Sequence, residues 1–232
     1  MRKIFLLVAI AVAIVMAVAP QATAYSVTVN WYPGYQSGSG GEFTLTPKDG
    51  LEFVLPWYDP KAKYPYPADP NKSQLAFESF CLEKLETVTQ AGTYNAVLNN
   101  SAVWGGVGPG GDPISQGTAW LYEQFAEGTL AGYIYTVGAA RIASAGALQN
   151  TIWWLEGEIA ARPDNIFTTA VEAKFADPKA NNEGKYHALV LNLTKRDGSR
   201  AQDQLIYWVP EPGTLLLLGL GLLSIAGVRR KL

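Results

Sequence analysis

The chain of 232 residues contains one cysteine, Cys81, in the stretch ESFCLEKLE. A glutamine, Gln149, lies in the stretch ALQNTIWWLEGE, on a predicted helix. At about 100° per residue, Ile142 falls within ~20° of Gln149 and Trp153 within ~40°, so Gln149 faces the apolar half of that helix. A buried primary amide without partners costs about 1–3 kcal/mol, so Gln149 needs hydrogen bonds or another reason to lie there.

A cysteine and a glutamine that meet in a folded protein can react with each other. The thiolate attacks the side-chain amide carbonyl, ammonia leaves, and the product is an intramolecular thioester. This reaction requires the sulfur to be held against the carbonyl and sheltered from water. The thioester is a stored electrophile, because an amine on a partner can attack the acyl carbon and become covalently attached.

The residues around this pair resemble the thioester domains of bacterial surface adhesins. Those domains carry an aromatic-Cys-apolar motif on a β element and a Gln-x-x-Ile-Trp motif on a helix, matched here by residues 80–82 and 149–153. The stretch TAWLY (118–122) resembles the first helix of the helical insert in that family. The resemblance implies a thioester between Cys81 and Gln149, with shielding by Phe80, Trp120 and Trp153.

Other chemistries remain open or are disfavoured. Alternatively, Cys81 is a small core residue, as most free cysteines are. The protein would then be a non-reactive structural protein of the extracellular polymer matrix. A secreted hydrolase would use the carboxylates of Glu83, Glu86, Glu156 and Glu158.

The glycine-rich stretch 106–111 contains Pro109 and no βαβ unit surrounds it, which argues against nucleotide binding. We expect no enzyme activity, no cofactor and no metal site, and a structural or exposed role for His187, the only histidine.

Periodicity predicts an α+β fold, with a helical pair inserted into an antiparallel, sandwich- or barrel-like β body. Before the helices, strands are predicted at 25–31, 42–46 and 51–55 and a strand pair at 75–89 and 93–98, with a proline-rich loop at 56–73. One helix is predicted to begin at Asp112 as N-cap with Pro113 as its first residue, and a second to run from about Ala139 to Ala161, before Pro163. Further strands are predicted at 165–175, 186–193 and 203–208.

The pattern of residues 1–24 predicts a secretory signal peptide. Arg2 and Lys3 precede an uncharged run, and a small-x-small exit ends at Ala24. An exported chain with one cysteine cannot form an internal disulfide, so its thiol is buried, paired with another chain or used chemically.

The C-terminus, residues 209–232, resembles the PEP-CTERM sorting signal of Gram-negative bacteria. Val209, Pro210, Glu211 and Pro212 precede an apolar segment, and a basic cluster ends the chain. At about 1.5 Å per residue, residues 214–228 form a marginal transmembrane helix, with the basic end expected in the cytoplasm. The resemblance implies that an exosortase-type membrane protease cuts near the motif and releases or transfers the protein to the cell exterior.

Between these ends, residues 25–208 are predicted to form one domain with its own core. Of 18 Lys and Arg and 20 Asp and Glu residues, five basic and one acidic lie in the two ends, which leaves 13 basic against 19 acidic in the domain. This balance disfavours nucleic acid as a partner. The sequence therefore predicts an exported surface or matrix protein that is anchored transiently and can capture an amine-bearing partner.

Overall fold

The computed structural model describes residues 25–38, 40–51, 76–103 and 111–208. The predicted signal peptide, most of the strand predicted at 51–55, the proline-rich loop 56–73 and the C-terminal transmembrane helix lie outside the described residues. Within these ranges, no helix combines the length and apolar character that a bilayer crossing requires.

The β body is a six-stranded antiparallel sheet with the order β3-β2-β1-β4-β7-β8. Many residues of these segments are β-branched or aromatic, which favours strands. The strands β7 and β8 are buried on both faces. The strands are β1 (Tyr25–Asn30), β2 (Phe43–Lys48), β3 (Phe77–Ser79), β4 (Gly92–Asn99), β7 (Ala188–Thr194) and β8 (Gln204–Tyr207). A small two-stranded sheet is formed by β5 (Ser101–Ala102) and β6 (Asp112–Pro113).

The chain just after β3 joins the two edges of the large sheet. Leu205 donates its backbone N–H to Phe80 (3.0 Å), Leu82 donates to Asp203 (3.1 Å), and Cys81 forms an antiparallel bridge with Gln204. The first strand in the order is thereby connected to the last. The sheet is nearly barrel-shaped, with Cys81 at its closing seam, and the predicted α+β class with an antiparallel β body is confirmed.

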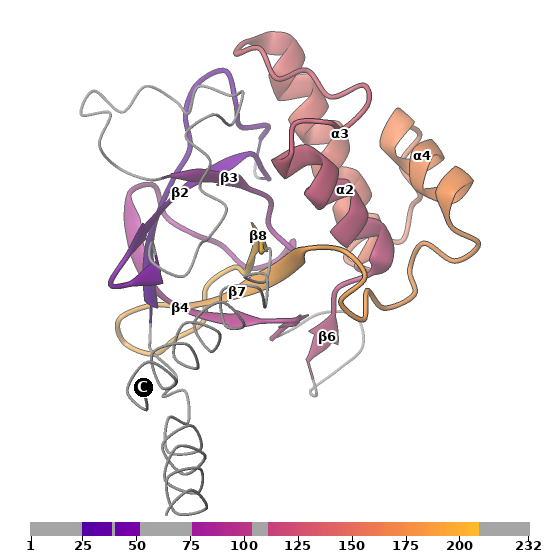
Figure 1. The fold of residues 1–232 in the computed structure, drawn as a ribbon. Helices are drawn as coiled ribbons and strands as arrows, with labels where there is room; N and C mark the ends of the chain where they lie inside the picture. The colour runs from indigo at the N-terminus through magenta and orange to yellow at the C-terminus, as the bar shows by residue number, and fades with distance from the viewer. Residues whose placement is uncertain (1–24, 39, 52–75, 104–110, 209–232) are drawn as a thin grey trace, which may run out of the picture.

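Three helices lie between β6 and β7 in the sequence and pack together on one side of the β body (Figure 1). They are α2 (Gln116–Ala126), α3 (Ala139–Leu155) and α4 (Ile166–Lys174). Two of them correspond to the predicted helical pair. The third, α4, replaces the strand that was predicted at 165–175.

The prediction of a strand at 165–175 was wrong because a helix cap outweighs the β-branched composition. The Asn165 side chain accepts hydrogen bonds from the backbone N–H groups of Phe167 and Thr168. Phe167, Thr168 and Val171 are then the buried positions, which is the spacing of one helical face. The cap and this spacing make the segment a short helix.

The predicted ends of the other helices also shift. Ser115, not Asp112, caps α2, because its side chain accepts from the Thr118 N–H at 3.1 Å, while Asp112 and Pro113 belong to β6. Helix α3 ends at Leu155 rather than near Ala161, and Gly157 follows with a φ of 81°. A positive φ suits glycine and stops the helix well before Pro163.

The core has two parts that meet at the closing seam. One lies between the helices and the sheet and includes Phe80 and Leu82. The other lies within the β body and includes Cys81, together with Trp153 from α3. Successive residues at the seam thus face different cores, and Cys81 lies where the helices meet the barrel.

Candidate functional site

Cys81 and Gln149 lie in contact, although 68 residues separate them in the sequence. The Cys81 thiol donates to the Gln149 carbonyl oxygen, with Sγ and Oε1 3.2 Å apart. Cys81 is 0% and Gln149 1% exposed to solvent. The structure therefore brings together the two predicted thioester residues in a site that excludes water.

The Gln149 amide is held by main-chain groups in a fixed orientation. Its Oε1 accepts from the N–H of Gly41 at 2.8 Å and from the N–H of Cys81 at 3.2 Å. Its Nε2 donates to the Cys81 carbonyl at 2.8 Å. These donors and the acceptor define which end of the amide is oxygen, and that oxygen is the atom in contact with the sulfur.

Gly41 lies close to Cys81 because it comes just before β2, and Cys81 comes just after β3. The antiparallel β2–β3 ladder ends at the pair Phe43 and Ser79, so the two segments leave the ladder side by side. A Cβ on Gly41 would lie 2.5 Å from Phe80 Cδ1 and 2.9 Å from Gln149 Oε1, and a Cβ on Gly40 would lie 2.6 Å from Gln149 Cγ. Only glycine lets the backbone approach the amide this closely.

The glycine pair is the part of the site that sequence reasoning missed. Gly40 and Gly41 belong to a glycine- and serine-rich stretch between the strands predicted at 25–31 and 42–46, which shows no chemistry of its own. The signal that could have found them is their place immediately before β2, the strand that pairs with the cysteine-bearing segment.

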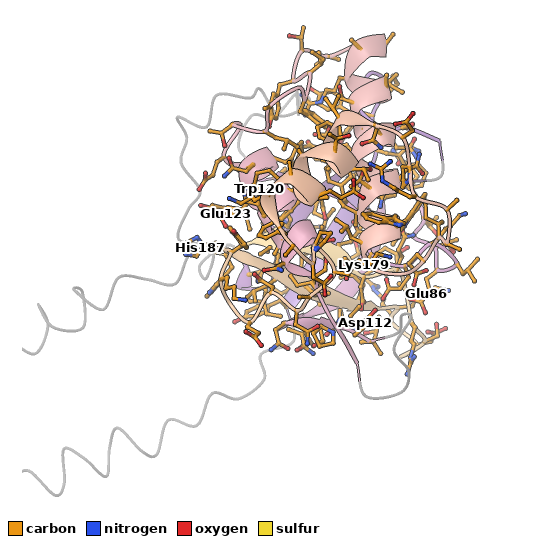
Figure 2. The ribbon with its side chains drawn as sticks, turned by 90° about the vertical axis from the view of Figure 1, so that its right-hand side faces the viewer. Glu86, Asp112, Trp120, Glu123, Lys179 and His187 are labelled. Atoms are coloured by element: carbon orange, nitrogen blue, oxygen red, sulfur yellow. The ribbon has the colours of Figure 1, made fainter. Side chains whose placement is uncertain are left out.

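The predicted shielding residues have different positions. Phe80 is 0% exposed and Trp153 is 6% exposed, and both contact the glycine pair that covers the amide. Trp120 instead packs edge-on against Phe175 with Lys174 over its ring, and Figure 2 shows it near Glu123. The structure does not support a shielding role for Trp120 at this pair.

Burial keeps the Cys81 thiol in its protonated form. Desolvation raises the pKa of the thiol well above its usual value, and the nearby Glu83 carboxylate raises it further. The Trp153 side chain and the backbone N–H groups of Cys81 and Gly41 act in the opposite direction. The resting site thus holds a neutral thiol whose proton points at the amide oxygen.

A buried carboxyl pair lies next to the site. Glu83 Oε2 accepts from the backbone N–H of Asp203 at 2.9 Å, and Asp203 accepts from Asn192 Nδ2 at 2.7 Å. Burial and the Asp203 charge raise the pKa of Glu83 to about 9, and burial also raises the pKa of Asp203. Glu83 therefore holds a proton at neutral pH, which reduces the negative charge close to Cys81.

Of the other acidic residues considered for hydrolysis, Glu86 lies near the same carboxyl pair: partial burial raises the pKa of its carboxyl, and the charges of Asp203 and Glu158 raise it further. Glu156 accepts from Ser115 Oγ at 2.8 Å and from the Thr118 hydroxyl, while Glu158 accepts from the Lys84 N–H at 2.9 Å. No group of three or more His, Cys, Asp and Glu residues suited to a metal ion occurs in the described part of the chain.

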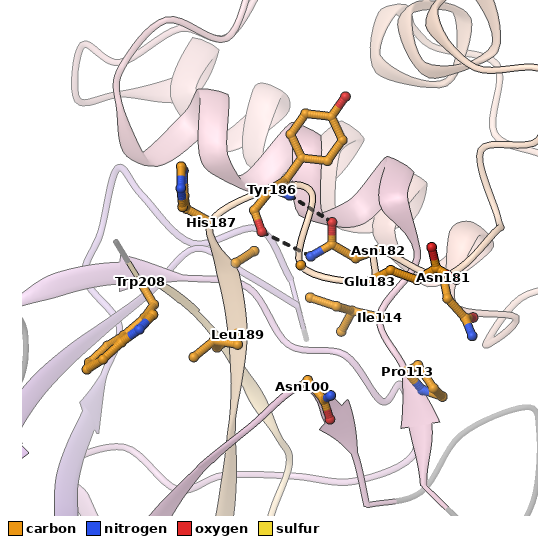
Figure 3. A pocket seen from close by; sticks show the side chains of 12 residues that line it. Asn100, Pro113, Ile114, Asn181, Asn182, Glu183, Tyr186, His187, Leu189 and Trp208 are labelled. Carbon is orange, nitrogen blue, oxygen red and sulfur yellow. Dashed lines mark hydrogen bonds between the residues drawn. The ribbon is translucent and has the colours of Figure 1, made fainter. Parts of the chain in front are cut away.

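A cavity of about 490 Å³ lies elsewhere on the molecule, and neither Cys81 nor Gln149 lines it (Figure 3). Its walls include His187, Trp208 and Asn182. The Asn182 amide is occupied by two hydrogen bonds with the backbone of Tyr186, each 3.0 Å long. His187 is exposed at the rim, and its Nδ1 lies 3.3 Å from Glu123 Oε1. This position agrees with the structural or exposed role predicted for it.

Comparison with known proteins identifies the C-terminal signal. The PEP-CTERM protein-sorting motif matches residues 209–231. No curated protein and no solved structure matches the chain. The motif marks the chain as an exported protein that is sorted to the cell surface or matrix and processed by exosortase.

Proposed function

We propose that this exported protein carries an internal thioester between Cys81 and Gln149, through which it attaches covalently to an amine on a partner outside the cell. The observation that carries the proposal is the 3.2 Å contact of the thiol with the Gln149 carbonyl oxygen, inside a site with 0–1% exposure. No comparison with known proteins supports the thioester, so the proposal depends on this geometry and on the chemistry of the two side chains.

Bond formation is balanced within the site. The Cys81 sulfur bonds to the Gln149 carbonyl carbon, the bond from that carbon to Nε2 breaks, and the thiol proton leaves with the nitrogen as ammonia. The Gly41 and Cys81 N–H groups, 2.8 and 3.2 Å from Oε1, are placed to stabilise negative charge that develops on this oxygen. Such preorganised donors act strongly where water is excluded.

Attachment to a partner is the reverse type of acyl transfer. A primary amine attacks the Gln149 acyl carbon, an amide forms, one amine proton is lost, and the Cys81 thiolate leaves and is protonated. Because the pair is buried, the amine must enter through a local opening beside Trp153, Phe80 and the glycine pair. This shelter protects the thioester from hydrolysis until a partner reaches it.

The second candidate function is a non-reactive structural protein of the extracellular matrix with the same fold. The observation that favours it is that the Gln149 amide already makes hydrogen bonds at both ends, so its burial needs no covalent bond. In this alternative Cys81 is a buried thiol that donates one weak hydrogen bond. The two candidates differ in the mass of the folded protein.

Intact-mass measurement tests the proposal. The wild type is expected to lack the mass of one ammonia, and Cys81→Ala and Gln149→Ala are each expected to have their full mass. Gln124→Ala is the matched control, because Gln124 lies in α2 and bonds Thr129 rather than Cys81, and it should keep the deficit. Methylamine should add to the wild type and to the control only.

A full mass for the wild type, together with a thiol that a maleimide modifies completely after unfolding, would establish the structural alternative. Peptide mapping of the methylamine adduct should place the added group on Gln149. An adduct on any other residue would contradict the assignment of the acyl group.

A further inference from the structure

The described residues include three buried polar atoms with no hydrogen-bond partner, namely Glu83 Oε1, Trp153 Nε1 and Gln204 Oε1. All three belong to residues near Cys81: Glu83 influences the thiol electrostatically, Gln204 is its bridge partner, and Trp153 shares its core cluster. A buried donor without a partner is unfavourable, so a native protein that keeps one invites a functional explanation.

Of these three atoms, Trp153 Nε1 is the one that is a hydrogen-bond donor whatever the protonation state of the site. Trp153 is 6% exposed and lies one helical turn after Gln149 on α3, on the same face. A Cβ on Gly40 would lie 3.0 Å from its ring, so the ring is packed tightly over the site. Its Nε1 is buried without a hydrogen-bond partner in this state, and Trp153 packs in the same core cluster as Cys81.

We infer that the Trp153 indole N–H stabilises negative charge on the Cys81 sulfur during acyl transfer to and from Gln149. This inference rests on the proposed thioester. A neutral thiol is a weak acceptor, whereas a thiolate is a strong one, so the unpaired donor gains its partner only when charge develops on sulfur. An interaction that is stronger in the transition state than in the ground state accelerates the step.

The site then supplies a donor for each atom that becomes negative. The Gly41 and Cys81 N–H groups serve the carbonyl oxygen of Gln149, and the Trp153 N–H serves the sulfur. The same donor acts in both directions. It stabilises the attacking thiolate when the thioester forms and the leaving thiolate when an amine opens it.

The test replaces Trp153 with benzothienylalanine, which keeps the bicyclic ring and puts a sulfur atom where the indole has N–H. Trp153→Phe is the second variant and removes the N–H with a smaller ring. The matched control makes both changes at Trp154, the next residue on α3, whose ring faces Lys179 (4.5 Å from ring centroid to Nζ) rather than the site. Circular dichroism checks that each variant is folded.

The first readout is the rate of thioester formation, followed by intact mass after refolding. Loss of one charged hydrogen bond predicts formation about 10- to 100-fold slower in both Trp153 variants, with no change in the Trp154 controls. An unchanged rate in the benzothienylalanine protein would overturn the inference while leaving the thioester itself established.

The second readout does not need the thioester. In a Gln149→Ala background the thiol stays free, and the pH dependence of its alkylation reports its pKa. Removal of the Trp153 N–H should raise that pKa by about one unit or more, whereas the Trp154 controls should not move it. An unmoved pKa would contradict the inference even if the wild type formed no thioester at all, so the two proposals can fail separately.

Discussion

At the scale of single residues, the site depends on how one side-chain amide is held. Gln149 forms hydrogen bonds with both the N–H and the C=O of Cys81, as a neighbouring strand would, and also receives the Gly41 N–H. The partners that fix the amide are thus main-chain groups of Cys81 and Gly41 rather than side chains. Backbone donors of this kind require close approach, and close approach requires glycine.

The Gly41→Ala substitution should therefore disturb the site directly. Its Cβ would overlap Phe80 and crowd Gln149 Oε1, which should lower the free energy of unfolding by about 1–3 kcal/mol in urea denaturation and abolish the mass deficit. Gly146→Ala in α3 is the control. There the added methyl meets the end of the Ser37 side chain, which can move, and the helix gains propensity. Equal stability of the two variants would contradict this explanation of Gly41.

The two reactive residue types could be found from the sequence, but their surroundings could not. One cysteine and one inward-facing glutamine are visible as chemistry and as helix phase. Gly41 could not be recognised, because its role depends on the β2–β3 register and on the seam that Cys81 forms with Gln204. These are long-range pairings that local composition does not encode.

At the scale of elements, a buried ion pair links the start of β2 to α3. Arg141 Nε donates to Glu42 Oε2 at 2.8 Å, and Tyr133 donates its hydroxyl to the same oxygen at 2.7 Å. Glu42 follows Gly41, and Arg141 lies two turns before Gln149 on its helix. The pair therefore helps to fix the glycine backbone against the helix that carries the amide.

Arg141→Leu should be strongly destabilising, because it leaves the Glu42 carboxylate buried without its partner. The expected loss is about 3–5 kcal/mol in the free energy of unfolding, measured by urea denaturation. The double variant Glu42→Leu/Arg141→Leu should lose less than the single variant, since no charge is left behind. Arg162→Ala, which breaks the exposed pair with Glu172, should show no measurable loss.

A double variant that loses more stability than Arg141→Leu would show that the two side chains act independently.

The predictions of elements from the sequence failed where a helix cap decided the outcome. Residues 165–175 have the composition of a strand, yet Asn165 begins a helix there, while the long apolar repeat of α3 was predicted correctly because its spacing extends over several turns.

At the scale of the whole molecule, burial of acidic groups governs the response to pH. Desolvation raises the pKa of Glu156 to about 7, although hydrogen bonds from Thr118 and Ser115 act against this. Burial also raises the pKa values of Glu78 and Glu83. Folding therefore favours the protonated form of these carboxyls, and the folded state binds more protons than the unfolded chain.

Stability should consequently fall as pH rises. For Glu156, the stabilisation present below the ordinary carboxyl pKa of 4.5 is lost as pH rises to about 7 and beyond, by up to ~3 kcal/mol. Urea denaturation between pH 4.5 and 8 measures this slope. Glu156→Gln should flatten part of it, whereas Glu172→Gln, at an exposed group, should leave it unchanged. A wild type that gains stability over this range would contradict the assignment.

An exported protein with a buried Cys81–Gln149 pair is proposed here to hold a covalent bond between these two side chains. A crystal structure of the purified protein tests it most directly, through the density between the Cys81 sulfur and the Gln149 carbonyl carbon. We expect continuous density at bonding distance and no density for the Gln149 nitrogen. A sulfur and a carbonyl carbon at van der Waals distance, with the Gln149 amide nitrogen present and hydrogen-bonded to the Cys81 carbonyl, would contradict the thioester.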